Sequence, residues 1–352
     1  MLSVIRLRFA CVFSLMLFPF PAAAEEQPAS ATPRQVVDYL PLAFQPETWK
    51  KSGVDARMEV WPGREVVFLV QPGSYDAERL AVWVQRLDRG WALYRDLTGA
   101  QPKSFKVWQK LPVIAAVPGP SFTCGAGCGY IGSTGIELAL FHSHDYPRLL
   151  AQPEAMPHYV FYEMGRNFYT FGERHSCFIT GFAVFMRYVC MDALRCTDED
   201  QKTRRAIEHQ ETFFHGSGLS FLELFTNSAA SGEKAHRIHD ASGKLIHPSD
   251  QPCTYASAML RLRRDCGGND WVRRFFAALA RSPEVPKTAE DGPLRQCRQW
   301  FLAASTAAQR DLSPVFVDQW RLPMSDNTRK KLRGVNWTQP PSITDLLSLF
   351  AE

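Results

Sequence analysis

A short segment in the middle of the chain has the spacing of a zinc-protease helix but lacks its histidines. In the pattern His-Glu-x-x-His, two histidines at positions i and i+4 share one helix face and bind one zinc ion, while the glutamate activates the metal-bound water. Residues 161–169 read Phe-Tyr-Glu-Met-Gly-Arg-Asn-Phe-Tyr. Tyr162 and Arg166 therefore occupy the two histidine positions, and Glu163 occupies the position of the catalytic base.

A third zinc ligand is missing as well. Sites of this kind take a further protein ligand, such as a glutamate, which is expected on the following helix. That helix is predicted from the segment "CFITGFAVFMRYVC", which has no acidic residue near Thr180 or Gly181, where the glutamate would stand. Arg166 carries a permanent cation and cannot coordinate a metal ion. The sequence therefore predicts neither zinc nor another cofactor at this segment.

Two segments carry a family resemblance. Glu163, Gly165 and Asn167 match a helix that reads roughly His-Glu-x-Gly-His-Asn in the gluzincin metallopeptidases of the enhancin and bacterial mucinase type, which the chain resembles. A second similarity to the helical domain of such proteins lies in residues 310–328; the matching residues are Asp311, Leu312, Phe316, Trp320, Pro323 and Ser325. The resemblance implies a sheet-plus-helix catalytic subdomain, a helical subdomain after it, and peptide or glycoprotein substrates.

Three roles are open for Tyr162, Glu163 and Arg166. In the first, the two charged residues form a structural ion pair at spacing i, i+3, partly buried by an apolar helix. In the second, the old cleft persists and binds a peptide or glycan, with Arg166 supplying a cation and with Asn167 and His175 as further binding residues. In the third, Glu163 is catalytic and activates Tyr162 as a nucleophile, as in sialidases, so that hydrolysis needs no metal.

A relocated metal site is another route to hydrolysis. His142 and His144 follow a predicted edge strand near residues 136–140, and alternate residues of a strand face the same side, which suits a metal. Glu137 and His158 could join these two histidines. Histidines in short loops are more often solvated, so this site remains an alternative.

The pattern along the chain predicts an α+β fold. Residues 56–73 hold two β-rich runs around Pro62-Gly63, which is typical of a hairpin. Asp76 is a predicted N-cap for a helix whose apolar residues keep helical spacing up to Gly99. Helical segments dominate the second half. We expect a strand-rich part with one long helix at 25–150, a helical part with the degenerate motif at 151–335, and a tail at 336–352.

Residues 1–24 have the features of a cleaved export signal. Arg6 and Arg8 precede an apolar run, and Ala22-Ala23-Ala24 offers a cleavage site before Glu25. The run is shorter than the roughly 18–20 residues that span a bilayer, although an uncleaved anchor is the alternative. Removing the two arginines lowers the net charge from +4 to +2, which gives no basic stripe for nucleic acid. We expect a secreted or periplasmic protein without an integral membrane span.

Eight cysteines remain once the signal, which holds Cys11, is removed. An even number of cysteines in an exported chain favours disulfides. The eight are Cys124 and Cys128, expected as a disulfide or packed thiols rather than half of a zinc site; Cys190 and Cys196, and Cys253 and Cys266, each close enough for a local bridge; and Cys177 and Cys297. The glycines around the first pair permit close backbone approach by a ligand, or they only shape a disulfide-closed turn.

Together these observations predict an exported metallopeptidase-like protein that has lost its zinc ligands. The function expected from them is non-catalytic binding of a protein, peptide or glycoprotein. The alternative is a hydrolase, active on peptides or glycans, that works without zinc or with a relocated metal.

Overall fold

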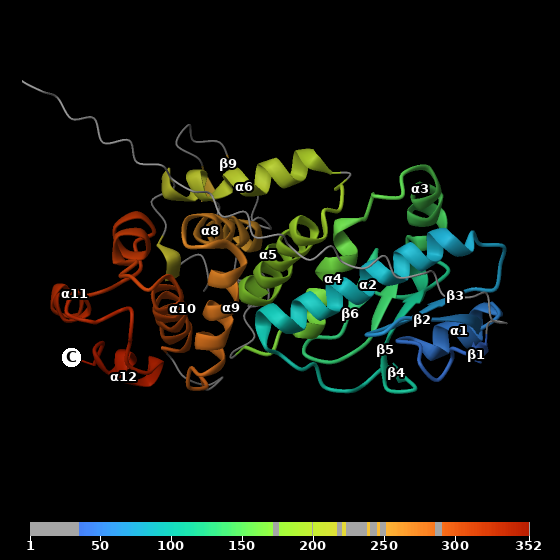
Figure 1. The fold of residues 1–352 in the computed structure, drawn as a ribbon, viewed down its shortest axis with the longest axis horizontal. Helices are drawn as coiled ribbons and strands as arrows, with labels where there is room; N and C mark the ends of the chain where they lie inside the picture. The colour runs from blue at the N-terminus through green and yellow to red at the C-terminus, as the bar shows by residue number, and fades with distance from the viewer. Residues whose placement is uncertain are drawn as a thin grey trace, which may run out of the picture. The chain divides into compact units, whose positions relative to one another are not determined.

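A mixed β-sheet forms the first part of the fold (Figure 1). The computed structural model describes residues 35–171, 176–198, 200–216, 220–222, 238–239, 245–246, 251–285 and 291–351, all within one compact unit. The sheet order is β1-β2-β3-β5-β7-β6, and β4 pairs with β5. The strands are β1 (Val36–Asp38), β2 (Arg57–Pro62), β3 (Val67–Val70), β4 (Val107–Trp108), β5 (Leu111–Ala116), β6 (Gly127–Gly129) and β7 (Ile136–Leu138).

Local sequence signals place the first half of this sheet. Strands β2 and β3 pair antiparallel with Pro62 opposite Val67, so the predicted hairpin is confirmed. Helix α2 (Ala77–Thr98) begins after Asp76, whose side chain accepts a hydrogen bond from the Arg79 N–H, and ends at Gly99 in the left-handed conformation. Because β3 and β5 are parallel, α2 serves as the crossover between them.

The sheet buries side chains on both faces. Phe68 and Ile114 point toward α2, which lies across one face (Figure 1), while their neighbours Val67 and Val113 point to the opposite face. That opposite face is covered by a smaller apolar cluster around α1 (Pro46–Ser52), with Trp49 1% exposed. This alternation is what burial on two sides of a strand requires.

Helices make up most of the chain after the sheet, so the predicted α+β fold is confirmed. A two-stranded sheet of β8 (Ile238–His239) and β9 (Leu245–Ile246) is described between them. The helices are α3 (Tyr146–Ala151), α4 (His158–Phe168), α5 (Ser176–Leu194), α6 (Gln201–Gly216), α8 (Gln251–Asp265), α9 (Gly268–Ala280), α10 (Gly292–Ala308), α11 (Asp326–Arg333) and α12 (Ile343–Ser348).

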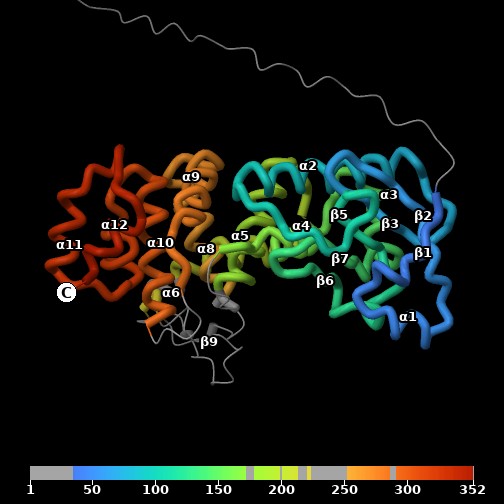
Figure 2. The backbone as a smooth tube through the Cα atoms, turned by 90° about the horizontal axis from the view of Figure 1, so that it is seen from below, coloured from blue at the N-terminus to red at the C-terminus, as the bar shows by residue number. Residues whose placement is uncertain are grey.

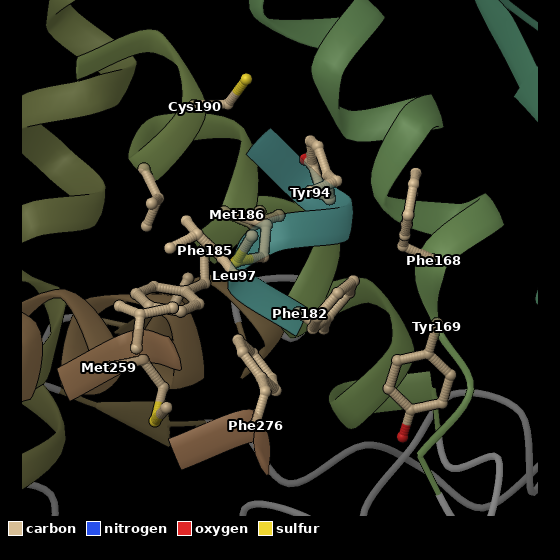
Figure 3. Packing of buried hydrophobic residues seen from close by; sticks show 14 of the residues in the cluster. Tyr94, Leu97, Phe168, Tyr169, Phe182, Phe185, Met186, Cys190, Met259 and Phe276 are labelled. Atoms are coloured by element: carbon tan, nitrogen blue, oxygen red, sulfur yellow. The ribbon is translucent and has the colours of Figure 1, made fainter. Parts of the chain in front are cut away.

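Helix α5 links the helices next to the sheet with those that follow. It packs on α2 and α4 on one side and on α8 on the other. Figure 3 shows the aromatic core at this junction. Tyr94 stacks on Phe168 with ring centroids 5.3 Å apart, and Phe182 meets Phe276 edge-on at 5.3 Å. Such pairs add about 0.5–1.5 kcal/mol beyond the area they bury.

The segment at residues 310–328 has packing roles. Phe316 and Trp320 are fully buried and meet edge-to-face at 4.8 Å. The Trp320 indole N–H donates to Oε1 of Glu211 at 2.7 Å, and Arg261 donates to the same oxygen at 2.6 Å. Ser325 is the N-cap of α11. Trp320 therefore ties this segment to Glu211 of α6, which in turn binds Arg261 of α8.

Replacing Gly181 by alanine should destabilise the protein. A Cβ atom at this position of α5 would lie 2.2 Å from Cδ1 of Tyr255 on α8, and the Tyr255 ring is fully buried. We expect the overlap to exceed the gain of about 1 kcal/mol in helix propensity, with a net loss of about 1–2 kcal/mol in the free energy of unfolding, measured in urea. Gly119→Ala is the control, because no atom lies within 4 Å of its Cβ position. An equal effect of both substitutions would contradict this packing.

Candidate functional site

The degenerate motif lies on α4, between the sheet edge and α5. Helix α4 contacts β6, β7, α2 and α5, and Figure 2 shows it beside β6 and β7. Val160, Phe161, Met164 and Phe168 are fully buried, which gives the helix an apolar face of helical spacing. Glu163 lies on the buried side and is 8% exposed.

Two further residues of the motif hold α4 in place. A Cβ atom on Gly165 would lie 3.0 Å from the Cα of Ala183, so the absence of a side chain permits the close crossing of α4 and α5. Asn167 is fully buried, and its amide N–H₂ donates to the carbonyl oxygens of Tyr130 and Gly135 at 3.0 and 3.1 Å. Asn167, predicted as a binding residue, thus fixes the loop that follows β6.

Glu163 binds the backbone of the edge strand. Its Oε2 accepts a hydrogen bond of 2.9 Å from the N–H of Gly129. Because the Tyr130 N–H donates to the Gly135 carbonyl in the β6–β7 ladder, the preceding Gly129 N–H points away from β7, as antiparallel pairing requires. The Glu163 carboxyl group therefore accepts a hydrogen bond from the outward-facing N–H of β6, which is the edge strand of the sheet.

Glycines allow this close approach. A Cβ atom on Gly127 would lie 2.8 Å from Cγ of Glu163, and one on Gly129 would lie 2.4 Å from the backbone oxygen of Glu163. The glycine-rich segment therefore lets strand β6 lie directly against α4. The strand predicted near residues 136–140 is confirmed as β7, but its predicted position at the edge was wrong, because β7 is an inner strand and the glycine-rich segment itself forms the edge.

The environment of Glu163 favours its neutral form. Burial raises the pKa of this carboxyl to about 7, although the Arg166 charge and the Gly129 N–H both act to lower it. Arg166 does not form the predicted ion pair, since no nitrogen of its guanidinium lies within 4 Å of a described carboxylate. Among the described residues, the Gly129 N–H is the hydrogen-bond partner of the Glu163 side chain.

Tyr162 and Arg166 lie on the outer side of α4. Both are half-buried; the Arg166 Nη1 donates to the Tyr162 hydroxyl at 3.3 Å, and the guanidinium lies 5.9 Å from the centre of the tyrosine ring. The Tyr162 hydroxyl thus contacts Arg166 and not Glu163. The structure does not bring together the nucleophile and base that metal-free hydrolysis would use.

A pair formed by the half-buried Tyr159 and the buried Asp145 adjoins Glu163. The Tyr159 hydroxyl donates to Oδ2 of Asp145, whose side chain is buried, and His144 Nδ1 lies 3.1 Å from Oδ1 of Asp145. Burial, Asp145 and Glu163 all raise the pKa of Tyr159. Sequence reasoning missed this pair. The i, i+4 spacing of Tyr159 and Glu163 could have revealed the tyrosine, but nothing in the sequence linked Asp145 to it.

The structure separates the proposed relocated metal ligands. His142 and His144 lie on a short π-helix (Phe141–Asp145) and not on a strand, so the prediction that they share one face was wrong. His142 Nε2 contacts the Ala116 carbonyl at 3.2 Å. His158 Nδ1 contacts Oδ1 of Asp198 at 3.2 Å. Within the described residues there is no group of three His, Cys, Asp or Glu side chains able to hold a metal ion.

Close packing occupies the position on α5 where a third zinc ligand would have been expected. Gly181 faces the ring of Tyr255, and the 2.2 Å distance from its Cβ position leaves no room for a glutamate. Thr180 is half-buried on the same helix. His175, predicted as a binding residue, lies outside the described residues.

The cysteines form one disulfide among the described side chains. Cys124 and Cys128 are bonded, with their Cα atoms 5.5 Å apart, as expected for the C-x3-C pair. The local bridges considered for Cys190/Cys196 and for Cys253/Cys266 are not formed. The Cys177 side chain lies outside the described residues, and Cys297 is buried in α10.

A second buried carboxyl group lies on the other face of the sheet edge. Glu137 of β7 is 0% exposed, and its Oε1 accepts hydrogen bonds from the Tyr39 hydroxyl at 2.6 Å and the Phe44 N–H at 2.9 Å. Burial raises the pKa of Glu137. Glu137 therefore ties the segment before α1 to the sheet and does not join the histidines.

Comparison with known proteins shows a similar fold in two solved structures. One is a functionally unknown conserved protein from Bacillus anthracis str. Ames, with a TM-score of 0.53 and 10% identity over 84% of this chain and 56% of that one. The other is a mutant of a functionally unknown conserved protein from the same organism, with a TM-score of 0.51 and 11% identity over 81% and 53% of the two chains. This chain thus spans about half the length of each, and the likeness concerns the fold alone.

No protein-family model and no curated protein matches the chain. Nor does any described helix have the length and apolar character needed to cross a membrane.

The stability of the protein should fall as pH rises through the range in which Glu163 titrates. The folded state holds the Glu163 proton up to about pH 7, whereas an ordinary carboxyl, as in the unfolded chain, loses it near 4.5. Between these values the folded state binds more protons, so the free energy of unfolding decreases with pH, by on the order of 3 kcal/mol from this group.

Glu163→Gln tests this directly. The glutamine oxygen can still accept from Gly129, but the side chain cannot ionise, so the variant should lose this part of the pH dependence and be the more stable protein at pH 8. Urea unfolding of both proteins at several pH values gives the comparison. Glu208→Gln, at a surface-exposed position of α6, is the control and should keep the wild-type slope. If the free energy of unfolding of Glu163→Gln depended on pH as it does in the wild type, Glu163 would not be the group responsible for this dependence.

Proposed function

We propose that the chain is an exported, gluzincin-like protein that binds peptides or glycoproteins without cleaving them. The resemblance of the α4 motif and of the segment at residues 310–328 supports the family and the substrate class. The replacement of both histidine positions by Tyr162 and Arg166 supports the loss of zinc, because neither side chain is a usual zinc ligand.

The observation that carries this proposal is that Arg166 is half-buried and lacks a carboxylate partner among the described residues. Its guanidinium is half-buried, stands at the second histidine position, and has no described carboxylate within 4 Å. A guanidinium is weakly hydrated and presents a fork of N–H donors that matches a carboxylate. Arg166, with the Tyr162 ring beside it, is therefore suited to bind an acidic group of a ligand, such as a peptide carboxylate or the carboxylate of an acidic sugar.

The surroundings of Glu163 support binding over catalysis. A general base must reach the proton that it removes, directly or through one water. Glu163 instead accepts from the Gly129 backbone, is 8% exposed, and has its pKa raised by burial. Those features suit a residue that holds the strand next to the binding surface.

Composition supports the partners and the location. The export signal predicted at residues 1–24 supports a secreted or periplasmic protein. The small net charge of the remaining chain gives no reason to expect nucleic acid or an anionic membrane as a partner.

Metal analysis tests the loss of zinc. We expect the purified protein to bind no stoichiometric zinc after dialysis against the metal, and to show no cleavage of casein or mucin. The measurements are elemental analysis of the dialysed protein and gel-based detection of fragments. Stoichiometric zinc, or cleavage that Glu163→Gln abolishes, would overturn the proposal in favour of a hydrolase.

Binding to immobilised casein and to sialylated mucin tests the role of Arg166. Arg166→Ala should weaken binding by about tenfold, which corresponds to ~1.4 kcal/mol, while Arg166→Lys should retain part of it. Arg273→Ala is the matched control, because Arg273 is an exposed arginine of α9 already paired with Asp96. Desialylated mucin separates recognition of acidic sugar from recognition of protein. Equal binding by wild type and Arg166→Ala would remove Arg166 as a ligand-binding residue.

A further inference from the structure

A cavity of about 380 Å³ lies where helices α2, α9 and α10 meet. Helix α9 packs against both of the other two, and the three contribute Gly99, Ala280 and Gln299 to the lining. Neither Tyr162 nor Arg166 lines it, so it is separate from the surface of the α4 motif. Sites that bind small molecules have volumes of about 300–1,000 Å³, so this cavity has room for a small ligand.

Two helices end at this cavity. The last residues of α2 line it, Thr98 and Gly99, and so do the last residues of α9, Leu279 and Ala280. The final carbonyl groups of an α-helix have no partner within the helix, and the aligned peptide dipoles place about half a negative charge at that end. Two such ends together make the cavity electronegative.

The side chains around the cavity do not offset this negative potential. Glu284 lines it and is exposed, whereas none of the described lining residues is a lysine, arginine or histidine. Arg281, next to Ala280, is exposed and is not part of the lining. The described surroundings therefore favour a positively charged ligand over a neutral or negative one.

The rest of the lining combines apolar surface with an amide group. Phe171, Leu279 and Trp300 are buried side chains that line the cavity. Gln299 is 4% exposed, and its Nε2 donates to the Pro283 carbonyl at 2.6 Å. That bond leaves Oε1 of Gln299 to accept a hydrogen bond from a ligand. The lining thus suits a molecule with an apolar body and a group that donates hydrogen bonds.

We propose that this cavity binds a small organic cation, namely a protonated primary amine on a short apolar chain. The ammonium group has three N–H donors, which match the carbonyl oxygens at the two helix ends and Oε1 of Gln299. The chain packs on Phe171 and Trp300. Free alkylamines and the lysine side chains of proteins both have this chemistry. The site does not depend on Arg166 or on the ligand binding proposed above.

Calorimetric titration of the full chain with n-hexylamine tests the site at about pH 7, where the amine is protonated. We expect one molecule to bind, at least about tenfold more tightly than n-hexanol, whose chain is equally long but uncharged. Binding of n-hexylamine no tighter than that of n-hexanol would overturn the proposal. Equal affinity for Nα-acetyllysine methylamide would identify protein lysine as the natural source of the cation, and weaker affinity would identify a free amine.

Two lysine substitutions on α9 place the binding at this cavity. Ala280 and Ala277 are both exposed, but only Ala280 lines the cavity. Ala280→Lys adds a cation at the helix end and should weaken n-hexylamine binding at least about tenfold, whereas Ala277→Lys, the matched control, should bind as the wild type does. Circular dichroism checks that both variants are folded. Equal affinities of the two variants would contradict this location.

Discussion

The close approach of helix α4 to its neighbours on two sides determines the geometry of the candidate site. Gly165 lets α4 meet α5, and Gly127 and Gly129 let β6 lie against the backbone of Glu163. Because α4 is packed closely on both sides, it cannot rotate about its axis, and the side chain at each motif position leaves the helix in a fixed direction. Glu163 points toward the strand, and Arg166 points outward. The two residues are one turn apart, and their surroundings differ because the Glu163 side chain bonds the Gly129 N–H whereas the Arg166 guanidinium contacts the Tyr162 hydroxyl.

The balance of energies explains why Glu163 differs from the base of a zinc site. Removing a carboxylate from water costs several kcal/mol, while one hydrogen bond to a charged group returns about 1.5–3 kcal/mol. Arg166 acts on it only at a distance, because its guanidinium contacts Tyr162 instead. A divalent cation would keep such a carboxyl ionised, whereas the surroundings of Glu163 raise its pKa.

The sequence predicted the elements that local signals specify. Pro62-Gly63 and the caps at Asp76 and Gly99 act within a few residues, and the hairpin and α2 have the expected places. Strand β6 escaped prediction because its three residues lie in a glycine-rich segment, whose extended form depends on pairing with the distant β7. Nonlocal contacts were equally hidden, since the Tyr159–Asp145 bond joins two elements that the sequence does not relate.

The spacing in the sequence predicted which residues share the motif helix, but the contacts of their side chains depend on how that helix packs. Glu163, Tyr162 and Arg166 share α4 as predicted, yet the sequence could not show that the two charges fail to pair. The histidine pair failed for a related reason. Residues i and i+2 face the same side of a strand but different sides of a helix. His142 and His144 lie on a π-helix, and no signal in the sequence indicated that helix.

The position of Glu163 also bears on how this sheet avoids other chains. Strand β6 ends the sheet order, and the unpaired N–H and C=O groups of such a strand can recruit a strand from a neighbouring molecule. Here the strand is only three residues long, and the outward N–H of Gly129 is already bonded to Glu163. The hydrogen bond to Glu163 therefore leaves one N–H donor fewer on this strand for pairing with another chain.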